Sequence, residues 1–122
     1  MYRFEKLDVW QKAMEFSKLV YEKSKKFPKE ETYGITSQLR RAVTSIPLNI
    51  AEGSACQTTK EFIQFLTFAL RSQYETVTVI KLAHLLEFLD ASDYRELEAK
   101  IAEVGRLLQG MLNSLKVKPT NI

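Results

Sequence analysis

The amino-acid sequence predicts an all-α protein, built as one antiparallel, up-and-down bundle of four helices. Apolar residues recur every three or four positions through most of the 122 residues, which is the spacing of one helix face. Only 4 residues are Gly and 3 are Pro, so the chain is poor in loops. A chain of this length forms one domain, residues 1–122, with helices expected over about 8–26, 33–52, 59–89 and 92–116 and a polar tail over 117–122.

The first helix is expected to begin at Asp8, which can cap it, with Gln11 completing a pair of the capping-box type. It ends near Phe27, because a residue that precedes proline avoids the helical conformation. Its inner stripe comprises Trp10, Ala13, Met14, Ser17, Val20, Tyr21 and Ser24.

The second helix carries a core face with a proline inside it. Pro47 lacks an N–H and crowds the preceding turn, so a kink is expected there. Gly53 is expected to end the helix in the left-handed conformation. The core positions are Ile35, Leu39, Val43, Ile46 and Ile50.

The third and fourth helices begin with clear signals. Thr58, with Glu61 three residues later, predicts a capped start for the third helix. This helix is apolar around most of its circumference, which is more than a monomeric bundle can cover and therefore indicates a subunit interface. Asp93 and Glu96 suit the positive start of the fourth helix. A seam of alternating three- and four-residue spacings follows, at Tyr94, Leu97, Ile101, Val104, Leu108, Met111 and Leu115.

Residues 33–53 read Tyr-Gly-Ile-Thr-Ser-Gln-Leu-Arg-Arg-Ala-Val-Thr-Ser-Ile-Pro-Leu-Asn-Ile-Ala-Glu-Gly. This segment resembles the signature of the four-helix-bundle proteins encoded within intervening sequences of bacterial 23S ribosomal RNA genes. The same superfamily includes the accessory variability determinant of diversity-generating retroelements. The resemblance covers essentially the whole chain and implies a homopentameric, barrel-like ring, with a reverse transcriptase as a possible partner.

Two positions depart from the family pattern. Relatives often carry a basic cluster after the Glu-Gly turn, where this chain has residues 54–57, Ser-Ala-Cys-Gln. This difference argues against a nucleic-acid contact by that loop. Arg71 stands where relatives often have glycine.

The net charge of +3 arises within residues 1–26, which hold seven basic and four acidic side chains. With the resemblance, this basic first helix favours a non-enzymatic homo-oligomeric scaffold that binds RNA, DNA or a nucleoprotein partner. The alternative is a purely structural or protein-binding oligomer without affinity for nucleic acid. A continuous basic face favours the first reading, and lysines neutralised locally by glutamates favour the second. The candidate nucleic-acid contacts are Lys12, Lys18, Lys23, Lys25, Lys26 and Arg40.

A structural polar cluster is predicted from Arg41, Glu52 and Glu75. Glu75 lies in a polar interruption of the third helix, so a buried Arg41–Glu75 pair between the second and third helices is plausible. Arg41 could instead contact phosphate. Adjacent residues on a helix point about 100° apart, so Arg40 and Arg41 are expected to have different roles.

The residues that most enzymes need are sparse in this chain. His84 is the single histidine and is expected at the edge of the core or at an interface, and Cys56 is the single cysteine. A tetrahedral zinc site needs about four such ligands, so neither a metal nor another cofactor is expected. Trp10 and Tyr33 are expected to pack between helices. The charged N-terminus and the lack of a long apolar run predict a cytoplasmic protein that does not enter membranes.

Overall fold

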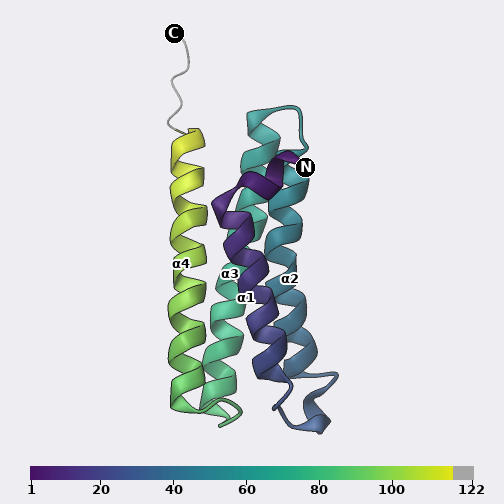
Figure 1. Cartoon of the computed structure of the whole chain (residues 1–122), viewed down its shortest axis with the longest axis vertical. Coiled ribbons are helices and arrows are strands. Elements are labelled where there is room, and N and C mark those ends of the chain that lie inside the picture. Colours follow the sequence, from purple (N-terminus) through teal and green to yellow (C-terminus); the bar gives the residue numbers. More distant parts are fainter. Residues whose placement is uncertain (117–122) are drawn as a thin grey trace.

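The computed structural model describes residues 1–116, and the predicted tail over 117–122 lies outside them. It contains four long helices that run alternately up and down: α1 (Asp8–Ser24), α2 (Ile35–Ser54), α3 (Thr59–Leu85) and α4 (Ala91–Lys116) (Figure 1). Two short 3-10 turns, η1 (Arg3–Lys6) and η2 (Lys29–Glu31), precede α1 and α2. The predicted all-α four-helix fold is therefore confirmed.

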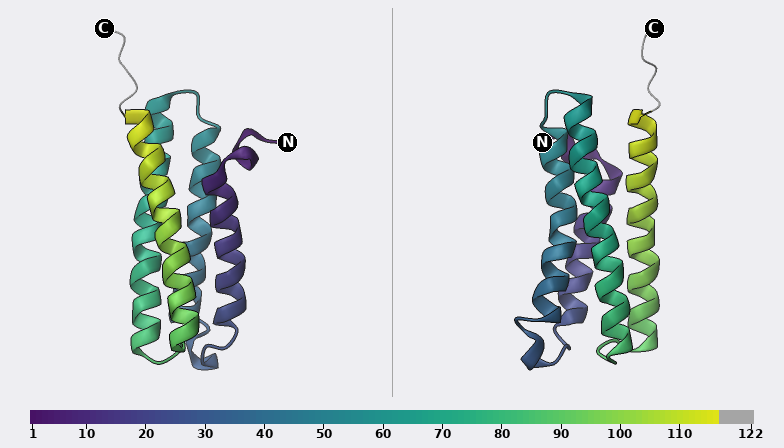
Figure 2. Two further views of the ribbon diagram at one scale, coloured as in Figure 1. Left: turned by 60° about the vertical axis from the view of Figure 1, so that its left-hand side comes forward. Right: turned by 180° about the vertical axis from the view of Figure 1, so that it is seen from behind.

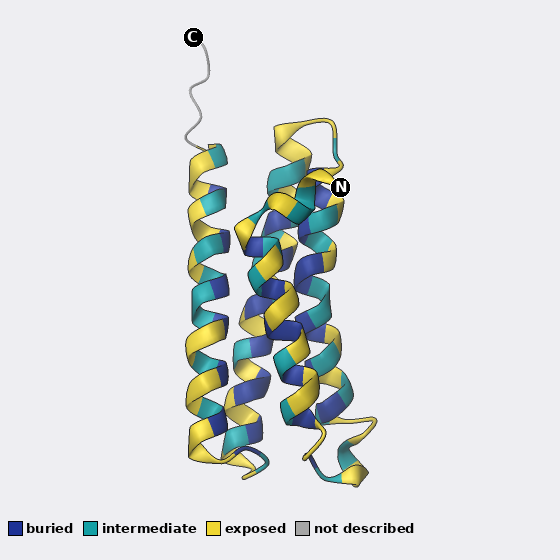
Figure 3. Ribbon diagram, viewed as in Figure 1, coloured by how far each residue is buried: buried dark blue, intermediate teal, exposed yellow. Residues whose placement is uncertain are grey.

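The helices pack as the corners of a square. Each packs closely against its neighbours in the sequence, and α1 also packs against α4, whereas the backbones of the diagonal pairs lie farther apart (Figures 1 and 2). Buried positions face the common centre and exposed positions face outward (Figure 3). The largest fully buried side chains include Leu39, Ile46, Ile50, Leu66, Ile80, Leu97, Ile101 and Leu108.

Pro47 lies inside α2, which continues through it to Ser54. Proline has no N–H for the carbonyl of Val43, four residues earlier. The hydroxyl of Ser17 on α1 lies 3.4 Å from that carbonyl oxygen and 2.9 Å from the carbonyl oxygen of Ala13, and is placed to donate to both. A neighbouring helix thus supplies a donor where α2 lacks its own.

The prediction that Gly53 ends α2 in a left-handed conformation is wrong. Gly53 is helical, and none of the glycines in the described part of the chain has a positive φ. A Cβ at this position would lie 2.8 Å from both Phe62 Cδ1 and Phe65 Cβ. The glycine is required because α3 passes closely over the end of α2, and a side chain would fill that space.

The start of α1 also differs from the prediction. Leu7 occupies the cap position without a side-chain cap, and Asp8 is already helical. Gln11 does not reach back to Asp8, because its amide donates to the carbonyl oxygen of Glu5 at 2.7 Å. For α3 the predicted cap is confirmed, since Thr58 Oγ1 accepts a hydrogen bond from the Glu61 N–H at 3.1 Å.

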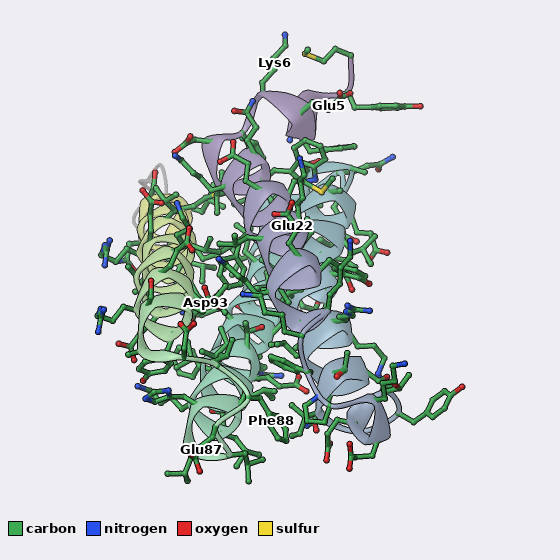
Figure 4. All side chains as sticks on the ribbon, turned by 60° about the horizontal axis from the view of Figure 1, so that its bottom comes forward. Glu5, Lys6, Glu22, Glu87, Phe88 and Asp93 are labelled. Carbon is green, nitrogen blue, oxygen red and sulfur yellow. The ribbon has the colours of Figure 1, made fainter. Side chains whose placement is uncertain are left out.

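The third helix ends at Leu85, four residues before the predicted end. Glu87 takes a left-handed φ of 64°, and the Phe88 N–H donates to the carbonyl oxygen of Ala83 at 2.8 Å. This is the hydrogen bonding of a Schellman motif, and it turns the chain toward α4 (Figure 4). Asp90 then caps α4, because its Oδ1 accepts from the Asp93 N–H at 2.7 Å. The sequence pattern concealed this turn because apolar residues continue through it.

Candidate interaction surfaces

Two of the predicted basic contacts, Lys23 and Lys26, connect α1 to α4. Lys23 Nζ lies 2.9 Å from Asp93 Oδ1 and 3.3 Å from Glu96 Oε1, and Lys26 Nζ lies 3.1 Å from Asp93 Oδ2. Hydrogen bonds from Lys23 and Lys26 lower the pKa of the Asp93 carboxyl. The hydrogen bonds to Asp93 and Glu96 raise the pKa of Lys23. Both lysines are therefore neutralised by carboxylates of α4.

The lysines nearer the start of α1 also stand among carboxylates. Lys12 and Lys18 border a shallow groove of about 220 Å³ between α1 and α4. Three glutamates and a further lysine share its rim, and its floor is apolar. The remaining lining residues are Glu15, Glu22, Lys100, Glu103, Phe16, Leu19 and Val104. Lys25 is exposed. Along α1 the basic side chains therefore do not form a continuous positive face.

Arg40, predicted as a nucleic-acid contact, joins α2 to α1. Its Nε donates to Ser24 Oγ at 2.9 Å, and its Nη2 donates to the carbonyl oxygen of Tyr21 at 3.3 Å. The guanidinium also lies 4.5 Å from the centre of the Tyr21 ring. Arg40 thus has the structural role that had been expected of its neighbour.

The predicted buried pair of Arg41 and Glu75 is wrong. Both residues are exposed, and the described residues contain no ion pair between them. They line the same shallow hollow on the α2–α3 surface, whereas Glu52 lies three turns farther along α2. Here α2 and α3 are joined by small hydroxyls instead, with Ser45 Oγ 2.9 Å from Ser72 Oγ.

An apolar groove of about 440 Å³ runs between α1 and α2. Leu48 is 59% exposed beside it. The turn η1 places Phe4 at one end, where its ring centre lies 5.1 Å from that of Trp10. The groove is lined by Phe4, Trp10, Met14, Ser17, Thr44, Pro47, Leu48 and Ala51. Met14, predicted on the inner stripe of the first helix, is exposed and lines this groove.

A second set of exposed apolar residues gathers at the C-terminal end of α3, and exposed Arg71, Glu75 and Thr78 separate it from Phe68 farther back along the helix. Leu85 is the most open of them, with 79% of its surface exposed. Leu82 and Leu86 are its exposed companions. The prediction that Tyr33 packs between helices is wrong, since this residue is 96% exposed in the α1–α2 connection.

His84 belongs to a group of side chains that joins α3 to α4. Its ring stacks on Tyr94 with 3.9 Å between the centres. The Tyr94 hydroxyl donates to Glu98 Oε2 at 2.6 Å, and Lys81 Nζ donates to the same oxygen at 2.7 Å. The hydrogen bond from Lys81 is the larger cause of a lowered pKa of the Glu98 carboxyl, and the hydrogen bond from Tyr94 is the next.

Cys56 precedes the start of α3 and His84 lies at its other end, so the two side chains do not form a nucleophile pair. Within residues 1–116 no group of three or more His, Cys, Asp or Glu side chains is arranged to hold a metal ion. None of the helices in this part of the chain has the length and apolar character needed to cross a bilayer.

The description "23S rRNA-intervening sequence protein" belongs to a family model that matches residues 5–110. The chain belongs to this family. The solved structures that resemble this chain include a crystal structure from Bacteroides thetaiotaomicron, described as a protein of unknown function from the S23 ribosomal protein family. The two are 26% identical, with a TM-score of 0.78 over 85% of this chain and 97% of the other. No curated protein matches the chain.

Proposed function

We propose that this chain is a non-enzymatic homo-oligomeric scaffold whose copies associate through the apolar surfaces of α1, α2 and α3. The observation that carries the proposal is apolar exposure on two different sides of the bundle. The groove between α1 and α2 includes the exposed Leu48, and the outer side of α3 carries the exposed Leu85. Exposed large apolar side chains that gather in this way are typical of protein interfaces.

The positions of these two surfaces favour a head-to-tail assembly. In Figure 1, α1 lies in front and α3 behind it, and Figure 2 shows α3 from the other side. When the outer side of α3 in one copy packs into the groove of the next, both patches are covered. A heterologous contact of this type closes into a ring when the rotation between copies allows it. Five copies, as the family resemblance implies, are the form we propose.

The charge distribution on α1 supports this proposal over nucleic-acid binding by α1. Lys23 and Lys26 are bound by Asp93 and Glu96. Lys12 and Lys18 share their groove with three glutamates. A phosphate backbone approaching this face would meet both signs of charge, which reduces the electrostatic attraction.

Light scattering coupled to gel filtration tests the assembly. At micromolar concentration we expect a mass of about 70 kDa, five times the 14.1 kDa of one chain. Leu48→Gln and Leu85→Gln should each lower the mass, because each places a polar amide in one half of the contact. Tyr33→Gln is the matched control, since it changes an exposed apolar residue outside both surfaces. A stable wild-type monomer would refute the proposal.

A further inference from the structure

The outward side of α4 carries basic side chains that no carboxylate of the described residues binds. Residues at alternating spacings of four and three form this side, which we call the α4 stripe: Arg95, Ala99, Ala102, Arg106, Gln109, Asn113 and Lys116. Its three cations are exposed and have no ion-pair partner within residues 1–116. Two glutamates border the stripe: Lys81 neutralises Glu98 at 2.7 Å, and Glu103 lines the groove between α1 and α4 together with Lys12, Lys18 and Lys100. The α4 stripe therefore differs from α1, where lysines and glutamates are mixed.

An exposed aromatic ring lies beside the α4 stripe. Tyr74 on α3 is 66% exposed and lines two hollows, one of about 300 Å³ and one of about 350 Å³. The larger hollow extends across to Arg106 and Gln109 of the stripe. An exposed phenol ring next to unpaired cations suits stacking with a planar group that is attached to a negatively charged one, such as a nucleotide base and its phosphate.

The same hollows are lined by a polar group that lacks a partner. Gln73 is buried, and its Nε2 donates to the carbonyl oxygen of Ile101 at 3.1 Å. Its Oε1 has no hydrogen-bond partner among the described residues. A Cβ on residue 105 would lie only 2.5 Å from Gln73 Nε2, so Gly105 is what leaves room for this amide. A buried amide oxygen without a partner inside the protein is satisfied by a donor from solvent or from a ligand.

We propose that the α3–α4 face binds single-stranded nucleic acid. The phosphates contact Arg95, Arg106 and Lys116, which follow one another along α4 at intervals of about 15 Å. An unpaired base stacks on Tyr74, and the Gln73 side chain turns toward it so that Oε1 accepts a hydrogen bond from a base N–H. The small side chains of Ala99 and Ala102 let the strand approach the helix closely. A duplex does not satisfy this site, because its bases are already stacked and paired.

Fluorescence anisotropy with the full chain tests the proposal, using a short labelled oligouridylate, the matching oligothymidylate and a duplex of the same length. The single strands should bind more tightly than the duplex, and more weakly at about 200 mM than at about 50 mM salt. Tyr74→Leu should weaken single-strand binding roughly 5- to 100-fold without changing the salt slope. Arg106→Gln should weaken it and reduce the slope of log K against log salt by about 0.7.

Arg41→Gln is the matched control, because it removes the same charge from an exposed position on the α2–α3 surface, and it should bind like wild type. Binding of either single strand supports the proposal, and tighter binding of oligouridylate identifies RNA as the target. The proposal is overturned by an absence of binding at low salt or by equal losses for Arg41→Gln and Arg106→Gln. It is equally overturned if Tyr74→Leu has no effect. The proposal is also overturned if Tyr74→Leu lowers both the affinity for single strands and the mass measured by light scattering. The α3–α4 face would then be a contact between copies of the chain.

Discussion

Single side chains in this protein compensate for local departures from helical rules. Ser17 supplies a hydroxyl to the Val43 carbonyl that Pro47 leaves without its helical donor. Glu87 takes a left-handed φ of 64°. This conformation costs a residue with a Cβ about 1–2 kcal/mol. The two backbone hydrogen bonds of the Schellman motif offset that cost. In both cases the compensating group comes from the surrounding backbone or from another helix.

The relation between Ser17 and Pro47 can be measured. Ser17→Ala should lower the free energy of unfolding by about 1–3 kcal/mol, because the buried Val43 carbonyl loses its donor. In a Pro47→Ala background the same change should cost less, since the substituted residue has a backbone N–H that can donate to the Val43 carbonyl. Urea unfolding of the four proteins gives this double-mutant cycle. An equal cost of Ser17→Ala in both backgrounds would contradict the compensation.

Between elements, the closeness of α2 and α3 depends on a glycine within α2. Gly53→Ala should destabilise the protein by about 1–3 kcal/mol, because the new methyl lies 2.8 Å from Phe62 and Phe65 atoms and forces the helices apart. Gly110→Ala is the matched control on α4, where a Cβ meets nothing within 4 Å. That change should stabilise the chain by up to about 1 kcal/mol through helix propensity. Thermal or urea unfolding should show opposite signs for the two variants.

In the whole molecule, the four-helix bundle is completed by the packing of α4 against α1. Asp93 on α4 stabilises this contact by ion pairs with Lys23 and Lys26. The two lysines lower the pKa of Asp93 in the folded state. The ionised Asp93 carboxylate therefore stabilises the fold at pH values above the pKa that Asp93 has in the unfolded chain. This stabilisation is lost as the pH falls through the lower pKa that Asp93 has in the folded protein. Asp93→Asn should therefore destabilise the protein at pH 7.

The difference between wild type and Asp93→Asn should shrink as the pH falls below about 4, where the wild-type carboxyl becomes protonated. Urea midpoints measured between pH 7 and pH 2 check this. Glu30→Gln, at an exposed position without an ion pair within residues 1–116, is the control and should show no such convergence. A constant difference across the range would show that Asp93 does not act through its charge.

The four helices could be read from the sequence because each has a local signal. The spacing of Leu39, Val43 and Ile46 marks a core face whatever surrounds it, and the Thr58–Glu61 cap forms within a single turn. The end of α3 could not be read in this way. Leu86 and Leu89 continue the apolar pattern past the Schellman turn, and only their positions in the bundle show that the helix has already ended.

The candidate functional residues likewise separate into features that the sequence predicts and contacts that depend on the tertiary structure. The sequence established the fold class, the order of the helices and a surplus of apolar surface on α3, because these follow from periodicity along one chain. Only the tertiary structure decided that Arg40 binds α1 while Arg41 is exposed, and that Asp93 neutralises Lys23 and Lys26. It likewise brought Tyr74 beside the α4 stripe. Pairing between charges depends on which helix faces which, and residues 67 positions apart carry no local signal of that contact.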